Sequence, residues 1–101
     1  MPAYVVGDIR VTDPGKFGTY VPPALEAVAR YGGRLLAAGG GGNMEALDGA
    51  PLPERMVVIE FPDTDAVRRW YRSAEYQAVL SIRLASTQGC VFLIDGARQP
   101  Q

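Results

Sequence analysis

The chain has 101 residues, of which 48% are hydrophobic and 21% are charged, and its net charge is -1. These values are close to the averages of soluble globular domains, and no apolar run approaches the roughly 20 residues of a membrane helix. A chain of this length makes one domain with a small core, which we expect at residues 1–96, followed by a tail at 97–101.

The charge pattern excludes further classes of function. The ten basic residues, nine of them arginine, are scattered along the chain, so the basic surface of a nucleic-acid-binding protein is missing. The segment after Met1 has neither the basic nor the apolar region of a secretory signal. We therefore expect a cytoplasmic protein that binds neither nucleic acid nor membranes.

Histidine is absent, which removes the commonest general base, the commonest metal ligand and the usual axial ligand of haem. The single cysteine, Cys90, lies in the apolar run at 90–94, where we expect a buried thiol that acts as a small hydrophobe. Zinc sites and Ser-His-Asp or Cys-His arrangements cannot be assembled from this chain. We expect no metal and no resident cofactor, so catalysis would use carboxylates, tyrosines, arginines, hydroxyls or a borrowed cofactor.

Residues 3–11 predict the first strand, because β-branched and aromatic residues dominate there. The period of two in a strand places Asp8 and Arg10 on the same side. Asp13 then suits the N-cap of a helix, and Pro14 suits its first position, where the missing N–H costs nothing.

Apolar residues three or four apart predict that this helix has one apolar face. Pro22 and Pro23 interrupt the pattern, so we expect a short helix, a break and a second helix that begins near Pro23. Gly32 and Gly33 predict a left-handed cap at its end. The apolar positions are Phe17, Tyr20, Val21, Leu25, Val28 and Tyr31.

Residues 34–39 predict the second strand. The glycine run at 39–42 matches neither GxGxxG nor GxxxxGK[ST], so we favour a bulge or irregular turn over a phosphate-binding loop. We expect the same strand to resume at 43–48. Residues 55–61, RMVVIEF, predict the third strand.

A second helical region follows, with Asp63 as its N-cap. Ser73 is expected to cap the helix anew, because the apolar stripe changes phase there. The last strand is predicted at 90–95, after Gly89. The new stripe beyond Ser73 consists of Tyr76, Val79, Leu80, Arg83 and Leu84.

The order strand, helix, strand, strand, helix, strand is the split βαβ arrangement of ferredoxin-like folds. The predicted fold class is therefore α+β, a ferredoxin-like βαββαβ unit with an antiparallel four-stranded sheet. The strands carry apolar residues on both faces, but helices can cover only one face of such a sheet. A homodimer with a barrel-like interface, in which two sheets face each other, explains the second apolar face.

Four segments together match a known family: YVVGDIRVTDPGKFGTY (4–20), YGGRLLAAGG (31–40), RMVVIEFPD (55–63) and WYRSAEYQAVLSIRLAS (70–86). In these segments the chain resembles small bacterial proteins of the DUF1330 family, within the dimeric alpha-beta barrel superfamily. The resemblance covers about residues 3–96 and implies the fold and the dimer. The DUF1330 family has no established common activity, so no catalytic residue is carried over.

The wider superfamily implies a range of activities. It includes cofactor-free monooxygenases, isomerases, cyclases and haem-dependent members, beside proteins with no known chemistry. The lack of histidine argues against the haem-dependent kind.

Two classes of function follow. In the first, the protein is a cofactor-free isomerase, cyclase or monooxygenase that holds a hydrophobic, carbonyl-bearing or aromatic small molecule between helices and sheet. Asp8 would accept a proton, Arg83 would stabilise an anion or enolate, Tyr20 or Tyr76 would donate a hydroxyl proton, and Trp70 would form a pocket wall. In the second class, the dimer is a non-catalytic module that binds a small molecule or a protein.

Each predicted site residue also has a structural interpretation. Asp8 could pair with Arg10 or Arg83, and Arg83 could reach water while its stem packs on the apolar face. Tyr20, Tyr76 and Trp70 could belong to the core. A closed cavity lined by Asp8, Tyr20, Tyr76 and Arg83 would favour the enzyme, and a solid core would favour the binding module.

Overall fold

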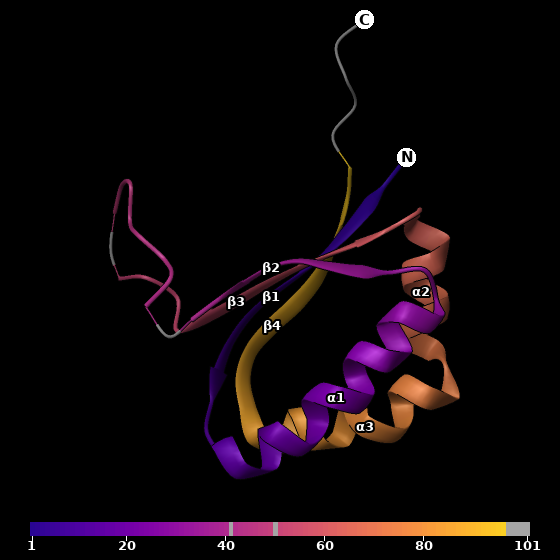
Figure 1. The fold of residues 1–101 in the computed structure, drawn as a ribbon, viewed down its shortest axis with the longest axis horizontal. Coiled ribbons are helices and arrows are strands. Elements are labelled where there is room, and N and C mark those ends of the chain that lie inside the picture. Colours follow the sequence, from indigo (N-terminus) through magenta and orange to yellow (C-terminus); the bar gives the residue numbers. More distant parts are fainter. Residues whose placement is uncertain (41, 50, 97–101) are drawn as a thin grey trace, which may run out of the picture.

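A four-stranded antiparallel sheet with helices packed on one face forms the frame of the protein (Figure 1). The computed structural model describes residues 1–40, 42–49 and 51–96, so the predicted tail at 97–101 lies outside the described residues. The strand order is β2-β3-β1-β4, and the α+β, ferredoxin-like prediction is confirmed. The elements are β1 (Ala3–Val11), α1 (Pro14–Arg30), β2 (Arg34–Gly39), β3 (Arg55–Phe61), α2 (Thr64–Arg72), α3 (Ala74–Ser86) and β4 (Thr87–Asp95).

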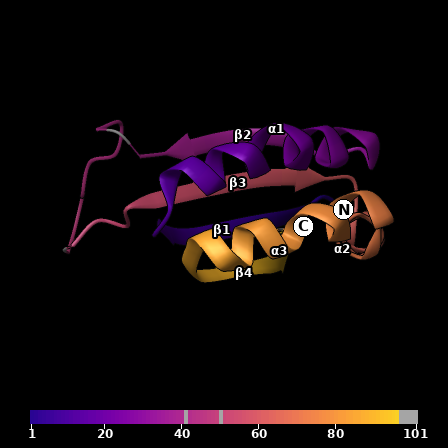
Figure 2. The same ribbon diagram turned by 90° about the horizontal axis from the view of Figure 1, so that it is seen from below.

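The helices divide the inner face of the sheet between them. α1 runs along the half formed by β2 and β3, whereas α3 runs along the half formed by β1 and β4 (Figure 2). Alternation buries Val5 of β1 and Ile59 of β3 beneath this helical layer. The resulting core consists of Ala3, Val5, Ala24, Ala27, Val28, Ile59, Phe61, Ala66, Val67, Trp70, Tyr76 and Leu80.

Helix α1 is continuous, so the predicted break at Pro22 and Pro23 is wrong. Phe17 before the prolines and Val28 after them are both buried, and a break would take one of them out of the core. Pro22 is exposed on the other side of the helix, where water can bond to main-chain carbonyls that lose their N–H partners. Tertiary packing therefore overrides the local preference of proline.

The turn at the end of α1 matches the prediction. Gly32 has a φ of +83°, in the left-handed region that favours glycine. The N–H of Gly33 donates to the carbonyl of Val28, and that of Gly32 donates to the carbonyl of Ala29. This is the bonding expected where a left-handed residue closes a helix.

The strand predicted to resume at 43–48 does not form. Residues 42–49 belong to a loop that projects beyond the end of the sheet (Figure 1). The side chain of Asn43 accepts from the N–H of Gly40 and donates to the carbonyl of Ala38, which turns the chain away from β3. The irregularity in β2 lies earlier, at Leu36, and Gly41 of the glycine run lies outside the described residues.

The second helical region begins and restarts as predicted. Asp63 accepts from the N–H of Ala66, and the Ser73 hydroxyl accepts from the N–H of Tyr76. Leu84 is 62% exposed, so its predicted place on the buried stripe is wrong. The buried face of α3 consists of Tyr76, Leu80, Arg83 and Ser86, and Leu84 points away from it. No helix in the described part of the chain combines the length and hydropathy of a membrane-spanning segment.

Strand β4 begins at Thr87, three residues before the predicted start at Cys90. Gly89 has a φ of +123°, and a Cβ atom there would collide with the main-chain carbonyl of Asp8. Gly89 is therefore a close-approach position within the strand rather than its boundary. The prediction of a buried Cys90 is wrong, because the thiol is exposed on the outer face of the sheet. Its neighbour Val91 faces the helices, so alternation turns Cys90 away from them.

The outer face of the sheet carries an apolar row that crosses all four strands. Ala37 pairs with Val58, Val58 pairs with Val6, and Val6 pairs with Phe92. No described helix covers this row, and Phe92 is 44% exposed. The sheet therefore has a second apolar face, as its sequence predicted.

Candidate functional site

A cavity of about 170 Å³ lies between the helical layer and the inner face of the sheet. Its walls come mainly from α1, β1 and β3, and most of its lining side chains are aliphatic or aromatic. Glycine at position 7 leaves the floor open, because a Cβ atom there would approach Val57 to 2.9 Å. The described lining residues include two tyrosines, two arginines and one tryptophan but no aspartate or glutamate: Tyr20, Tyr76, Arg55, Arg83 and Trp70.

A chain of hydrogen bonds connects three of these polar side chains. The hydroxyl oxygens of Tyr20 and Tyr76 are 2.7 Å apart, and the Nε of Arg83 donates to the Tyr76 hydroxyl over 3.3 Å. Tyr20 comes from α1, whereas Tyr76 and Arg83 lie two turns apart on the same face of α3. Because a guanidinium can only donate, the Tyr76 oxygen accepts this bond, and one of its lone pairs or its proton remains for Tyr20.

Arg83 is buried but has no anionic partner. It is only 8% exposed, so most of its side chain is out of contact with water. Within residues 1–40, 42–49 and 51–96, no carboxylate lies within 4.0 Å of its guanidinium. A guanidinium stays protonated in proteins, so Arg83 brings an uncompensated positive charge to the cavity.

The same environment keeps Tyr20 neutral. Burial raises the pKa of Tyr20 well above its usual value of 10.0, and the neighbouring Tyr76 raises it further. The Arg83 guanidinium opposes this rise but does not cancel it. Tyr20 therefore holds its proton at neutral pH and can serve the cavity as a hydrogen-bond donor, not as a base.

Trp70 forms a wall of the cavity, where the sequence placed it. Its ring packs against Tyr76 at a centroid distance of 4.3 Å and against Phe61 at 5.4 Å. Its indole Nε1 is buried and has no hydrogen-bond partner among the described residues. Trp70 is thus both a core residue and a lining residue.

The structure does not bring Asp8 together with the other predicted site residues. Ile9, its neighbour in β1, lines the cavity, so alternation sends the Asp8 side chain to the outer face. There it lies in register with Met56 on one side and Cys90 on the other. Asp8 is exposed, and Arg10 bonds to a glutamine rather than to Asp8.

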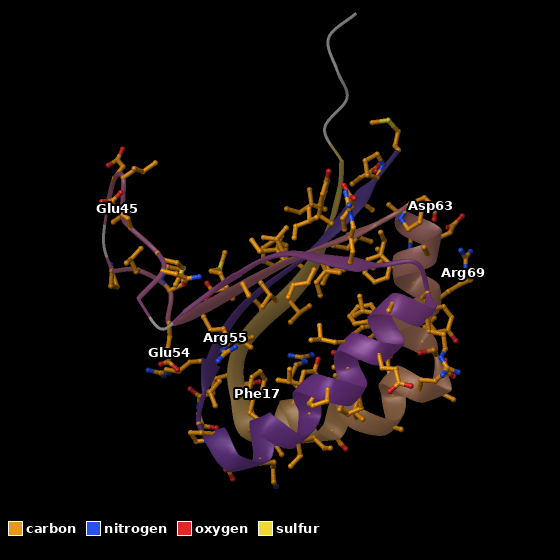
Figure 3. All side chains as sticks on the ribbon, viewed as in Figure 1. Phe17, Glu45, Glu54, Arg55, Asp63 and Arg69 are labelled. Carbon is orange, nitrogen blue, oxygen red and sulfur yellow. The ribbon has the colours of Figure 1, made fainter. Side chains whose placement is uncertain are left out.

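Arg55 is a lining residue that sequence reasoning missed. Its guanidinium lies over the Phe17 ring, 5.2 Å from the centroid, at the end of the cavity nearest the projecting loop (Figure 3). Because Arg55 is the first residue of β3, a charged side chain there is expected to point into solvent. The available signal was alternation, since Arg55 shares a side of β3 with the buried Ile59.

Similar structures were found among proteins of low sequence identity. A protein of unknown function from Rhodopseudomonas palustris is 14% identical, with a TM-score of 0.76 over 97% of this chain and 84% of its own. SnoaB, a cofactor-independent oxygenase from Streptomyces nogalater, is 20% identical, with a TM-score of 0.66 over 98% and 95%. A dimeric ferredoxin-like protein of unknown function from Jannaschia sp. CCS1 is 14% identical, with a TM-score of 0.65 over 97% and 100%.

These likenesses establish the ferredoxin-like fold and leave the reaction open. No curated protein matches the chain in sequence. The sequence pattern of the family described as "Domain of unknown function (DUF1330)" matches residues 2–97, which is nearly the whole chain. The protein therefore belongs to the DUF1330 family.

Proposed function

We propose that the protein binds a small hydrophobic molecule with a carbonyl group or an aromatic ring in this cavity and transforms it without a resident cofactor. The observation that carries the proposal is the convergence of Tyr20, Tyr76 and Arg83 in an otherwise apolar cavity. An apolar pocket with a few convergent polar groups is the usual form of a small-molecule site.

The polar groups suit a carbonyl oxygen on which negative charge develops. Arg83 brings a buried positive charge, and Tyr76 is the hydroxyl that it contacts. Donors that are already in place stabilise an enolate or oxyanion more than the neutral ketone, which lowers the barrier to its formation. This chemistry is common to isomerase, cyclase and cofactor-free monooxygenase reactions, and SnoaB has the fold and is a cofactor-independent oxygenase.

The proposal leaves Asp8 out of the reaction. A base must come within hydrogen-bond reach of the proton that it removes, and the sheet separates Asp8 from the cavity. Because the described lining contains no carboxylate, the second candidate function is binding of the same class of molecule without chemistry.

The proposal includes a homodimer formed through the outer face of the sheet. The apolar row through Ala37, Val58, Val6 and Phe92 supports it, because a closed two-fold contact would remove that row from water. The ferredoxin-like protein from Jannaschia, which shares the fold, is dimeric. In such a dimer the two cavities would lie on opposite sides of the interface, one beneath each helical layer.

Filling the cavity tests the proposed binding. A panel of single-ring ketones and phenols, beginning with acetophenone, should raise the melting temperature of the wild-type protein in proportion to occupancy. Ala24→Leu places three more carbons in the cavity wall and should abolish this rise, at a cost in stability of about 1–3 kcal/mol. Ala29→Leu makes the same change at an exposed position of α1 and should leave the rise intact.

Turnover separates the two candidate functions. Compounds that bind are incubated with the protein in air, and their loss or conversion is followed by chromatography. If the wild-type protein converts a compound and Ala24→Leu does not, the protein is an enzyme. Binding without conversion supports a non-catalytic binding protein. If no compound of this panel stabilises the wild-type protein, the cavity does not bind neutral molecules of this class. If Ala24→Leu binds them as well as Ala29→Leu does, the cavity is not the functional site.

A further inference from the structure

We infer that the ligand of this cavity is an anion, with about one aromatic ring or a short acyl chain, whose negative group pairs with Arg83. The inference rests on the proposed function in one respect, that a small molecule occupies the cavity. It adds the charge and the size of that molecule, which neither the fold nor the family supplies.

The bonding of Arg83 gives the first reason. Its Nε donates to the Tyr76 hydroxyl, and its charge also acts on Tyr20, but neither of these partners is an anion. Neither terminal nitrogen is among the described side-chain atoms that are fully buried without a partner. Arg83 is only 8% exposed and lines the cavity, so a ligand there lies within reach of its side chain. The fork of a guanidinium matches the two oxygens of a carboxylate.

The charge of the whole lining gives the second reason. Arg55 adds another guanidinium, which packs on Phe17 and forms no ion pair within the described residues. The described lining holds no carboxylate, and Tyr20 keeps its proton. An apolar cavity with two positive charges and no negative charge has a positive potential that the low dielectric of its walls strengthens. An anionic ligand would be stabilised there, and a cation would be repelled.

The size of the cavity gives the third reason. Drug-sized ligands occupy pockets of roughly 300–1,000 Å³, whereas a dry cavity of about 150 Å³ holds one benzene ring. At about 170 Å³, the cavity here is near the lower value. It fits a single ring with a small substituent and excludes a fused polycyclic substrate unless the helices move.

Benzoate and benzamide test the charge directly. The two molecules have nearly the same shape, but only benzoate is an anion at pH 7.5. Trp70 is the only tryptophan of the chain and lines the cavity, so its fluorescence reports occupancy without a label. Benzoate should bind about ten- to a hundredfold more tightly than benzamide, as expected for charge-assisted hydrogen bonds in a buried site.

Variants locate the preference. Arg83→Met should reduce it to less than threefold, whereas Arg83→Lys, which keeps the charge but not the fork, should retain part of it. Arg69→Met removes an exposed arginine of α2 and should leave the preference unchanged (Figure 3). Ala24→Leu should abolish binding of benzoate, which excludes an arginine at the surface as its site.

The outcomes separate this inference from the proposed function. Equal affinity for both probes, or tighter binding of benzamide, overturns the anionic ligand but leaves the cavity as a binding site. A benzoate preference that survives in Arg83→Met overturns the assignment to Arg83. Failure of both probes, together with failure of the neutral panel, overturns the binding site itself. If Arg83→Met does not fold, the comparison of the two probes on the wild-type protein still decides the charge.

Discussion

Tyr20 couples the chemistry of the cavity to the stability of the fold. Burial raises the pKa of Tyr20 above the value of 10.0 that it has in an unfolded chain. Between these two values the unfolded chain has lost the phenolic proton while the folded protein retains it. The unfolded state then binds fewer protons, so the free energy of unfolding must fall as the pH rises. The contribution of Tyr20 to the free energy of unfolding is therefore complete below about pH 10 and is lost progressively at higher pH.

We therefore expect Tyr20→Phe to flatten the loss of stability above pH 10. At pH 8 the variant should be less stable by about 1 kcal/mol, because it removes the hydrogen bond to Tyr76. Urea unfolding from pH 8 to 11.5 measures both effects, with Tyr71→Phe as the control at an exposed tyrosine. A residual slope should remain from Tyr4 and Tyr31, whose pKa values are also raised. Curves for Tyr20→Phe and the wild type that stay parallel above pH 10 would contradict this account.

The residues of the candidate site show what the periodic pattern of apolar residues in helices and strands can and cannot predict. Tyr20, Tyr76 and Arg83 fall on apolar helix faces in the sequence, and the structure brings all three to the cavity. The separation of Asp8 from them follows from the period of its strand, because Ile9 belongs to the core. The tyrosine pair could not be predicted, since it depends on how closely α1 approaches α3.

Helix α1 contains two prolines in its interior and still runs without a break. Each proline removes one main-chain hydrogen bond and crowds the preceding turn, which costs about 3 kcal/mol relative to alanine in an exposed helix. The buried face of the helix, formed by Phe17, Ala24, Ala27 and Val28, must offset this cost. The helix is therefore held by its packing on the sheet more than by its own propensity.

Replacing the exposed proline should then stabilise the protein. Pro22→Ala restores an N–H donor to α1, and we expect the free energy of unfolding to rise by about 1–2 kcal/mol. Only part of the full cost is recovered, because Pro23 still disfavours helical geometry at the residue before it. Pro14→Ala is the matched control, since proline suits the first position of the helix and its loss should be neutral or unfavourable. A fall in stability for Pro22→Ala, measured by urea unfolding, would mean that the helix is bent or broken at this point.

The elements that sequence reasoning placed correctly are those with local signals. The helix caps are Asp13, Asp63 and Ser73. Each accepts a hydrogen bond from the main-chain N–H of the residue three positions further along the chain, so each cap depends on only a few neighbouring residues. The early start of β4 depends instead on a partner strand that lies 76 positions away, as in the pair of Val11 with Thr87. Non-local pairing of this kind leaves no periodic signal in the strand itself.

At the scale of the whole molecule, the sheet has one face covered by helices and one that is not covered within the described residues (Figure 2). The outer face is mixed in character. Its central row is apolar, whereas Glu60 in the next row accepts hydrogen bonds from Arg34 and Tyr4. Asp8 and Cys90 form part of the row on the other side. The flanking rows also contain apolar residues, Ile94 in the first and Met56 in the second. An apolar band flanked by rows that carry charged side chains resembles a protein interface with a hydrophobic centre and a more polar rim.

The proposed homodimer predicts the mass of the protein in solution and the effect of one charge. Equilibrium sedimentation at micromolar concentration should give about twice the chain mass of 10.9 kDa. Phe92→Glu places a carboxylate in the apolar row, where it would be buried without a partner in the dimer but exposed in the monomer. The variant should therefore dissociate and still fold, with far-ultraviolet circular dichroism close to that of the wild type.

Two comparisons make the test specific to the outer face. Leu84→Glu adds the same charge at an exposed leucine on the outside of α3, away from the proposed interface, and should remain a dimer. Val6→Glu changes the centre of the row, where the side chain is only half-exposed, so it should either dissociate or fail to fold. A wild-type monomer would leave the apolar row without a partner and refute the proposal. Dimers of wild-type stability from both Phe92→Glu and Val6→Glu would place the interface elsewhere, and dissociation by Leu84→Glu alone would place it on the helices.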